Sequence, residues 1–304
     1  MQIAIVGAGA MGSLFGGLLG ESGANVWLID IRKDHVDAII ENGLRIEREG
    51  ATRCIKLKAT TDPDRVGPVD LVIIFVKSNH TAAAARTAVR LMDPDSLVLT
   101  LQNGLGNADT ISEIIDPQRV VAGTTSHGAT YIGPGKIRHA GAGPTVIGIW
   151  AGGNPEPARR IVEIFNAAGI DTGISDDIRS VVWDKLLINV GINAITALTG
   201  IKNGQMLDLE ITQALCRAAV EEALALARNL GINVRTDAVE HVLAVARATG
   251  PNRSSMGQDI DNRRQTEIGV INGVVVREAR TAGLEAPVNQ TLTALIETLQ
   301  AHYK

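Results

Sequence analysis

A glycine-rich turn near the start of the chain limits the fold more than any other feature of the sequence. Gly7-Ala8-Gly9-Ala10-Met11-Gly12 follows the apolar run Ile3–Val6 and opens a helix-like segment, Ala10–Glu21. In this setting GxGxxG is typical of a dinucleotide-binding βαβ unit. The first glycine permits a tight turn, the second lets a pyrophosphate approach, and the third allows close packing of helix and strand. The alternative is a plain glycine-rich turn.

Asp30 favours the dinucleotide interpretation. It ends the second apolar run, Val26–Ile29, and lies 23 positions after Gly7, near the offset of about 20 expected for an acid that binds the adenosine ribose. A carboxylate here would repel the 2′-phosphate of NADP, whereas Arg32 and Lys33 would attract it. Those two cations could also merely begin a solvated helix that ends near Asn42. Local physics therefore favours NADH only slightly.

The pattern of apolar residues changes near residue 175. Before it, short apolar runs such as Leu71–Val76 and Leu97–Leu101 alternate with helix-like segments, which is typical of a parallel sheet. After it come long Ala- and Leu-rich stretches; Ile211, Leu215, Ala219, Leu226 and Leu230 are spaced to share one helical face. We predict an α/β fold with a Rossmann-type dinucleotide-binding domain over residues 1–175 and an all-helical substrate domain over residues 176–304.

The amino-acid composition argues against several kinds of binding partner. The 304 residues carry 29 Lys and Arg against 33 Asp and Glu, so the basic excess that binds nucleic acid is missing. No apolar run reaches the length of about 18 residues that a membrane span needs, and no basic leader opens the chain. Cys54 and Cys216 form no CxxC pair, and the six histidines form no HxxxH pair. We expect a cytoplasmic protein without a metal site, a nucleic acid partner or a membrane partner.

A second group of polar residues lies in the later half. Lys185, Asn189 and Asn193 are spaced i, i+4, i+8, so they share one face of a helix whose other residues are largely apolar. Such a stripe faces either a crevice or a satisfied structural network in the core. Farther on, Asn252–Met256 and Arg263–Glu267 concentrate polar side chains. Taken alone, those two segments read as an ordinary loop and a helix cap at Thr266.

Taken together, these motifs resemble those of the ketopantoate reductase (2-dehydropantoate 2-reductase) family. Gln102-Asn103-Gly104, the run from Trp183 to Asn193, Ser254–Asp259 and Thr266-Glu267 occur in the family's order over almost the full length. The resemblance implies a C-terminal domain like that of 6-phosphogluconate dehydrogenase. It also implies reduction of 2-dehydropantoate to (R)-pantoate with hydride from NAD(P)H, in pantothenate and coenzyme A biosynthesis.

The resemblance further implies roles for individual residues. Lys185 would be the general acid, since an ammonium both stabilises and protonates the alkoxide that hydride addition creates, and Glu267 would position it and the substrate. The implied substrate contacts are Asn103, Asn189, Asn193, Asn252 and Ser255. The implied cofactor contacts are Gly7, Ala8, Gly9, Ala10, Met11, Gly12, Asp30, Arg32, Lys77, Asn103 and Glu267.

Several alternatives stay open at this point. Lys77 could be an ordinary lysine at the end of a strand. The family favours NADPH and commonly has an arginine directly after the second strand, where this chain has Asp30, so NADPH and NADH both remain. The substrate could be another branched 2-keto acid, or the chain could be a dinucleotide-sensing regulatory protein without turnover. Either a monomer or a homodimer fits, and His127 is expected to have a structural or cofactor-adjacent role.

Overall fold

The computed structural model describes residues 1–303, and its contacts divide the chain into two compact units. The sheet unit comprises residues 1–102 and 107–178, and the helical unit comprises residues 103–106 and the described chain from residue 179 onward. Residues 103–106 thus pack with the helical unit although the chain around them belongs to the sheet unit. The predicted domain limits, 1–175 and 176–304, stay predictions.

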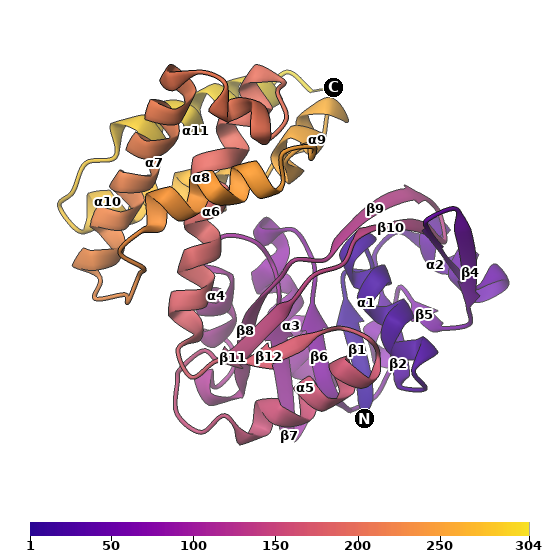
Figure 1. Cartoon of the computed structure of the whole chain (residues 1–304). Coiled ribbons are helices and arrows are strands. Elements are labelled where there is room, and N and C mark those ends of the chain that lie inside the picture. Colours follow the sequence, from indigo (N-terminus) through magenta and orange to yellow (C-terminus); the bar gives the residue numbers. More distant parts are fainter. Residues whose placement is uncertain (304) are drawn as a thin grey trace. The chain divides into compact units, whose positions relative to one another are not determined.

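An eight-stranded sheet forms the centre of the sheet unit (Figure 1). Its strand order is β12-β11-β8-β7-β6-β1-β2-β5, and all neighbours are parallel except β8 and β11. The predicted apolar runs form β1, β2, β6 and β7, which confirms the predicted parallel α/β core. The strands are β1 (Gln2–Val6), β2 (Asn25–Ile29), β5 (Lys58–Thr60), β6 (Val69–Ile74), β7 (Met92–Thr100), β8 (Val120–Thr125), β11 (Thr145–Ile149) and β12 (Thr172–Ile174).

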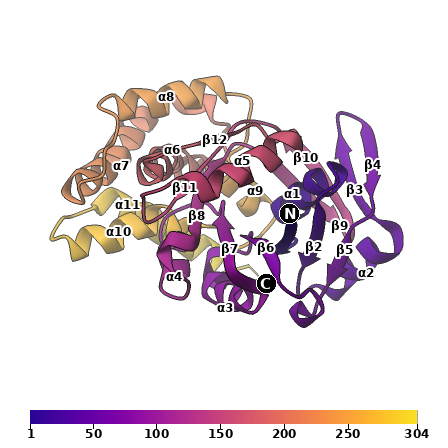
Figure 2. The ribbon, with the colours of Figure 1, turned by 90° about the horizontal axis from the view of Figure 1, so that it is seen from below.

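Helices cover both faces of this sheet. Figure 2 shows α1 and α5 on one side and α3 and α4 on the other. The rings of Phe15 and Phe165 meet between α1 and α5, with centroids 5.7 Å apart, so the two helices share one apolar layer with the sheet. The helices are α1 (Ala10–Glu21), α2 (Lys33–Asn42), α3 (Thr81–Leu91), α4 (Asn107–Ser112) and α5 (Glu156–Ala167), with 3-10 turns η1 (Pro63–Arg65), η2 (Ser78–His80) and η3 (Pro117–Arg119).

A small second sheet, which the sequence did not predict, packs against α1. Its order is β4-β3-β10-β9, formed by β3 (Leu44–Arg48), β4 (Ala51–Ile55), β9 (Gly128–Gly133) and β10 (Lys136–Gly141). Gly17 of α1 faces this sheet so closely that a Cβ there would collide with Ile46 and press on Leu44. The pairing of Lys136 with Arg45 joins segments far apart in the sequence, and no local periodicity reports such a contact.

The helical unit is built around α6 (Ile178–Thr199), which supplies Trp183, Leu187 and Val190 to its core. A Cβ on Gly191 would press on Val220 and Val242 at 2.8 Å, so α7 and α8 pack closely on α6. The remaining elements are α7 (Glu210–Asn229), α8 (Ala238–Ala248), α9 (Ser255–Asp261), α10 (Asn272–Thr281), α11 (Pro287–Gln300), η4 (Gly204–Leu207) and η5 (Ile268–Val270). This confirms the predicted helical second part.

By length and composition alone, α6 would pass for a membrane span, but 61% of its most apolar window is buried inside the protein. Burial of that extent is what the central helix of a helical core requires. The polar stripe of Lys185, Asn189 and Asn193 therefore lies on a core helix.

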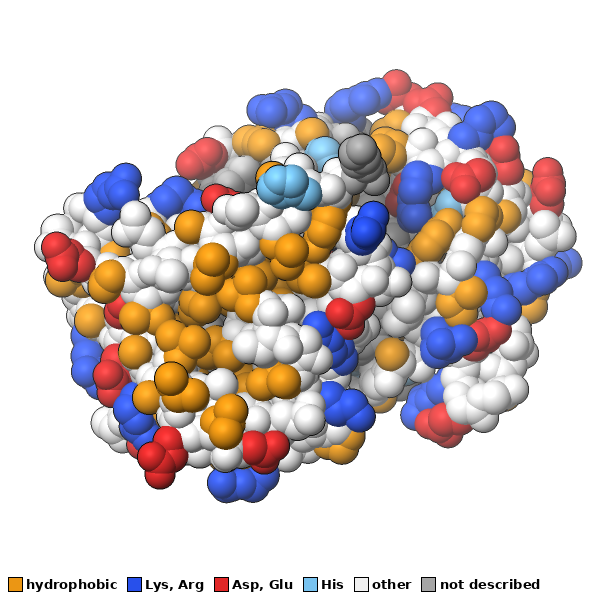
Figure 3. Space-filling view, turned by 90° about the horizontal axis from the view of Figure 1, so that it is seen from above, with side chains coloured by type: hydrophobic (Ala, Val, Ile, Leu, Met, Phe, Trp, Pro, Cys, Tyr) orange, Lys and Arg blue, Asp and Glu red, His pale blue; other side chains and the backbone are white. Residues whose placement is uncertain are grey.

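The predicted apolar face of α7 is buried only in part. Ala219 and Leu226 are fully buried, but Ile211 is 76% exposed and Leu230 is 48% exposed. The exposed large apolar side chains of the helical unit are Leu209, Ile211, Leu215, Leu230, Leu295 and Leu299. Figure 3 shows hydrophobic side chains gathered over the helical unit. The helical spacing was predicted correctly, but it did not distinguish buried from exposed apolar positions.

Candidate active site

The glycine-rich loop has the geometry of a phosphate cradle. Gly7 has a φ of +95°, and a Cβ there would lie 2.7 Å from the backbone nitrogen of Val76. A Cβ on Gly12 would collide with the carbonyl oxygen of Gly7, whereas a Cβ on Gly9 would meet nothing within 4 Å. A dinucleotide-binding loop needs a glycine for the tight turn, a glycine that lets the pyrophosphate approach, and a glycine that lets the helix pack closely on the strand. Gly7, Gly9 and Gly12 have the geometry for these three roles in that order. Ala10 and Met11 begin α1, whose N-terminal N–H groups favour an anion.

Asp30 and Arg32 form a tight pair beside this loop. The backbone N and the Nε of Arg32 donate to Oδ1 of Asp30 at 2.9 and 3.1 Å, and Nη2 donates to Oδ2 at 3.3 Å and to the Ala8 carbonyl at 3.2 Å. The guanidinium carbon also lies 4.5 Å from the ring centroid of Tyr131. Burial lowers the pKa of Arg32, but the hydrogen bond and charge of Asp30 raise it more. The two opposite charges therefore largely cancel at this edge of the sheet.

Lys77 and Gln102 follow the ends of the neighbouring strands β6 and β7. Lys77 is exposed at the start of η2. Nε2 of Gln102 donates to the Val76 carbonyl at 2.7 Å and to the Thr81 hydroxyl at 2.9 Å. The glutamine of the QNG motif thus ties the two strand ends together. No role for Gln102 follows from the sequence alone, because its two bonds join the ends of neighbouring strands.

Lys185, Glu267 and Asn103 come together in the helical unit. Lys185 is half-buried on α6, and burial lowers the pKa of its ammonium to about 8, although the Glu267 carboxylate raises it. Asn103 Nδ2 donates to Glu267 Oε2 at 3.0 Å. The backbone N–H of Leu105 donates to the Val270 carbonyl at 3.0 Å, which fixes the QNG turn against η5. An ammonium with a nearby carboxylate can donate a proton near neutral pH.

Apart from Asn103, the predicted substrate residues lie on α6 and on the segment that leads into α9. Asn189 is half-buried one turn beyond Lys185, and Asn193 is 5% exposed. Within the described residues, Nδ2 of Asn193 has no hydrogen-bond partner. A buried amide without a partner is costly, so this atom fits the role of a donor to a ligand.

Asn252 and Ser255 are exposed and flank the N-cap of α9. That cap, Ser254, is hydrogen-bonded to the Thr196 hydroxyl of α6 at 2.7 Å and accepts from the Gly257 N–H at 3.0 Å. Arg253 adds a hydrogen bond to the Ile201 carbonyl at 2.9 Å. Thr196 and Ser254 therefore hold the Asn252–Ser255 segment against α6, and Arg253 ties it to the chain just beyond that helix. Thr196 stands outside the motifs seen in the sequence.

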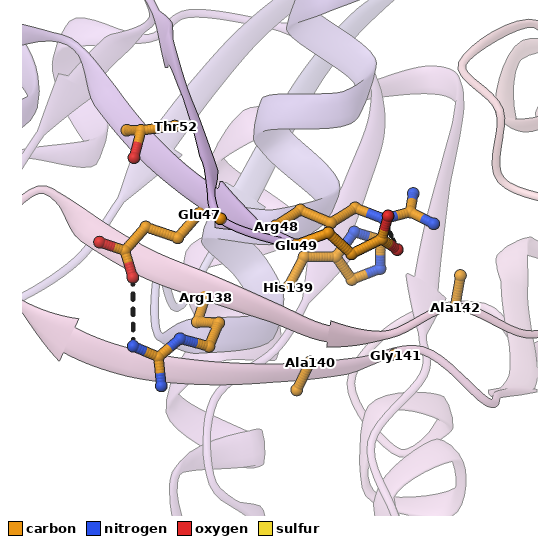
Figure 4. A pocket seen from close by; sticks show the side chains of 10 residues that line it. Glu47, Arg48, Glu49, Thr52, Arg138, His139, Ala140, Gly141 and Ala142 are labelled. Atoms are coloured by element: carbon orange, nitrogen blue, oxygen red, sulfur yellow. Dashed lines mark hydrogen bonds and ion pairs between the residues drawn. The ribbon is translucent and has the colours of Figure 1, made fainter.

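His127 lies in the sheet unit within a buried histidine pair. Its Nδ1 lies 3.2 Å from Nε2 of His139, and its ring meets Phe15 edge to face at 5.7 Å. Burial lowers the pKa of both histidines. Figure 4 shows His139 in a cavity beside β3 and β10, where Arg138 pairs with Glu47. The cavity is lined by Glu47, Arg48, Glu49, Gly50, Thr52, Arg138, His139, Ala140, Gly141 and Ala142, and none of these is a predicted site residue.

The fold and the comparisons with known proteins place the chain in the class of oxidoreductases that use a nicotinamide dinucleotide. Residues 3–152 match the family model described as ketopantoate reductase PanE/ApbA, and residues 177–300 match its C-terminal counterpart. The 2-dehydropantoate 2-reductase of Halobacterium salinarum is 38% identical over 301 residues, which cover 99% of each chain. The chain therefore belongs to the ketopantoate reductase family.

Solved structures agree with this placement. A PanE/ApbA family ketopantoate reductase from Ralstonia eutropha superposes with a TM-score of 0.90 at 35% identity and 99% coverage of both chains. A D-mandelate dehydrogenase solved with NADH and anilino(oxo)acetate gives a TM-score of 0.92 at 29% identity, again with 99% coverage of both. The fold is thus shared with enzymes named as reductases and dehydrogenases.

Proposed function

We propose that the chain reduces 2-dehydropantoate to (R)-pantoate, with Lys185 as the general acid. The observation that carries this proposal is the half-buried Lys185 ammonium, whose pKa of about 8 lies close to neutrality beside Glu267. At pH 7 a group with this pKa is about ten parts protonated to one part neutral. Most of the lysine is therefore protonated, and a pKa this close to the working pH also makes proton transfer to the substrate easier. General acid catalysis favours this combination. The 2-dehydropantoate 2-reductase relatives support the same substrate.

Each residue then has a defined task. A reduced nicotinamide supplies, when bound, the hydride for the substrate's carbonyl carbon. Lys185 donates its Nζ proton to the carbonyl oxygen, so that the oxygen ends as a hydroxyl group, and Lys185 regains a proton from water. Glu267, held by Asn103, keeps Lys185 charged despite burial. Amide and hydroxyl donors from Asn189, Asn193, Asn252 and Ser255 suit the carboxylate and hydroxyl groups of the substrate.

We propose that the contacts of the cofactor are the glycine-rich loop, Asp30, Arg32, Lys77, Asn103 and Glu267. We further propose NADH as the preferred form of the cofactor. Arg32 is engaged by both oxygens of Asp30, so a 2′-phosphate would have to compete with that carboxylate for the guanidinium and would be repelled by it. Asp30→Ala should raise kcat/KM for NADPH relative to NADH. Arg32→Ala should lower kcat/KM for NADPH if the phosphate does reach the guanidinium.

The remaining proposals concern the cellular setting. We propose a cytoplasmic enzyme of pantothenate and coenzyme A biosynthesis, acting as a monomer or a homodimer on a small 2-keto acid, without nucleic acid or membrane partners. The net charge of −4 supports the absence of a nucleic acid partner. Light scattering coupled to size exclusion would measure the oligomeric state.

The decisive experiment is an absorbance assay at the reduced-nicotinamide band with ketopantoate, run in parallel with NADH and NADPH. A panel of other branched 2-keto acids, compared by kcat/KM, tests substrate choice. Highest kcat/KM with ketopantoate supports the proposal, and higher kcat/KM with another keto acid would replace the substrate. Binding of dinucleotide without turnover of any keto acid would overturn the enzymatic role.

A further inference from the structure

A buried chain of hydrogen bonds within the sheet unit joins the β9–β10 turn to the glycine-rich loop. The backbone N–H of Gly135 donates to Nδ1 of His35 at 3.0 Å. Nε2 of His35 lies 3.1 Å from the Ser13 hydroxyl, which donates to the Ala8 carbonyl at 2.9 Å. The side chains of His35 and Ser13 are both fully buried. We call Gly135, His35, Ser13 and Ala8 the histidine relay.

The partners fix the direction of every bond in the histidine relay. A backbone N–H can only donate, so Nδ1 of His35 must accept and therefore carries no proton. A neutral imidazole with a bare Nδ1 has its proton on Nε2. Nε2 then donates to the Ser13 oxygen, and the Ser13 proton goes to the Ala8 carbonyl. Only the neutral ring satisfies all three bonds.

The end of the relay sets the orientation of one peptide group. The Ala8 carbonyl accepts from Ser13 at 2.9 Å and from Nη2 of Arg32 at 3.2 Å. In a planar trans peptide the C=O and the following N–H point in opposite directions, so the N–H of Gly9 is turned away from those donors. Gly9 is also the loop residue whose Cβ would meet nothing within 4 Å.

We propose that neutral His35 is a positioning residue for the dinucleotide: it holds the Ala8–Gly9 peptide with its N–H presented for phosphate, so cofactor affinity falls when the ring is protonated. The proposal rests on the proposed cofactor role of the glycine-rich loop. An imidazolium would set an Nδ1–H against the Gly135 N–H, two donors face to face. A fully buried ring in that position must move, and the Ser13 contact moves with it.

The surroundings of His35 agree with a neutral ring. Burial lowers its pKa first and the Arg32 charge lowers it further, while Asp30, the Ala8 backbone and Asp34 raise it. The ring of Tyr131 on β9 packs against it at a centroid distance of 5.3 Å. Since the pKa in the folded protein is below the ordinary value, the relay is intact at neutral pH. It is lost as the pH falls through that lowered pKa.

The test compares reduced-dinucleotide binding, followed by nicotinamide fluorescence between about pH 5 and 8, in the wild type and three variants. Ser13→Ala removes the link to Ala8 and should raise the Kd about fivefold at neutral pH, the equivalent of one net hydrogen bond. The KM for the keto acid should not change. Ser112→Ala is the matched control, because its buried hydroxyl on another helix of the sheet unit has no hydrogen-bond partner among the described residues; its Kd should stay at the wild-type value.

His35→Gln separates positioning from mere packing. Glutamine keeps an amide N–H donor at the position of Nε2 along the side chain but does not titrate. Its Kd should stay near the wild-type value at neutral pH and lose the rise on the acid side. A wild-type Kd in Ser13→Ala at every pH, or an unchanged acid-side rise in His35→Gln, would overturn the relay alone. No dinucleotide binding by the wild-type protein would overturn the proposed function and the relay together.

Discussion

Asn103 and Glu267 are joined by a hydrogen bond of 3.0 Å although 164 positions separate them in the chain. The bond anchors one oxygen of the carboxylate whose charge opposes the desolvation of Lys185. Asn103 reaches it from the QNG turn, where Gly104 has a φ of +82° and its missing Cβ leaves room for the Val270 carbonyl. The turn therefore contributes to the charge state of a lysine on α6 through an intermediate carboxylate.

The first prediction concerns pH. Because the proposed general acid, Lys185, has to be protonated and its pKa is about 8, kcat/KM for the keto acid should decline as the pH rises through that value. Glu267→Gln removes the charge that raises the pKa of Lys185, so the decline should begin at lower pH. The measurement is a kcat/KM profile of both proteins with ketopantoate. A Glu267→Gln profile that coincides with the wild-type profile would contradict the coupling.

The second prediction concerns Lys185 itself. Lys185→Ala should lower kcat by about 10²–10⁴-fold, the usual contribution of a general acid, with little change in cofactor Kd. Lys202→Ala is a suitable control, since Lys202 is an exposed lysine of the same unit, and its kcat should stay at the wild-type value. Near-normal turnover of Lys185→Ala would refute the role assigned to Lys185.

The sequence predicted those parts of the protein whose signals are local. The turn of Gly7 and Gly12, the span of α1 and the helical spacing of Lys185, Asn189 and Asn193 each follow from neighbouring residues. The small sheet was missed because β3 and β10 pair across about ninety intervening residues, which no short window records. The burial of α7 was predicted only in part. The spacing of its apolar residues shows that they share one face of the helix, but not which part of that face other elements cover.

The same distinction between local and tertiary signals holds for the residues of the proposed site. The polar stripe of α6 was recognisable because its period is helical. The Thr196–Ser254 bond and the His35 relay were not, since both join a helix to a distant loop or turn. His35 lies within the stretch from Lys33 to Asn42, for which a solvated helix was one interpretation, whereas its side chain is fully buried. Both contacts are tertiary, and sequence periodicity does not report them.

The third prediction tests how the Asn252–Ser255 segment, whose residues we propose as substrate contacts, is held. Thr196→Val keeps the shape of the side chain but removes the hydroxyl bonded to Ser254 at 2.7 Å. Loss of one net hydrogen bond should raise the KM for the keto acid about fivefold, while the cofactor Kd stays the same. Thr199→Val is the matched control on α6, because among the described residues its hydroxyl bonds only the Ile195 carbonyl of its own helix. Equal KM values for the two variants would argue against the role of Thr196.

The last prediction separates stability from cofactor binding within one loop. Gly12→Ala should lower the Tm, because its Cβ would collide with the Gly7 carbonyl and press on Ile5 at 3.2 Å. Gly9→Ala should leave the Tm near the wild-type value, since nothing lies within 4 Å of its Cβ, and the residue already has a φ of −63° that alanine tolerates. Its cofactor Kd should nevertheless rise at least about tenfold, because the methyl group occupies the side from which a pyrophosphate approaches. Calorimetry and nicotinamide fluorescence on both variants give the comparison, and a Gly9→Ala protein that binds the dinucleotide as tightly as the wild type would show that the phosphates lie elsewhere.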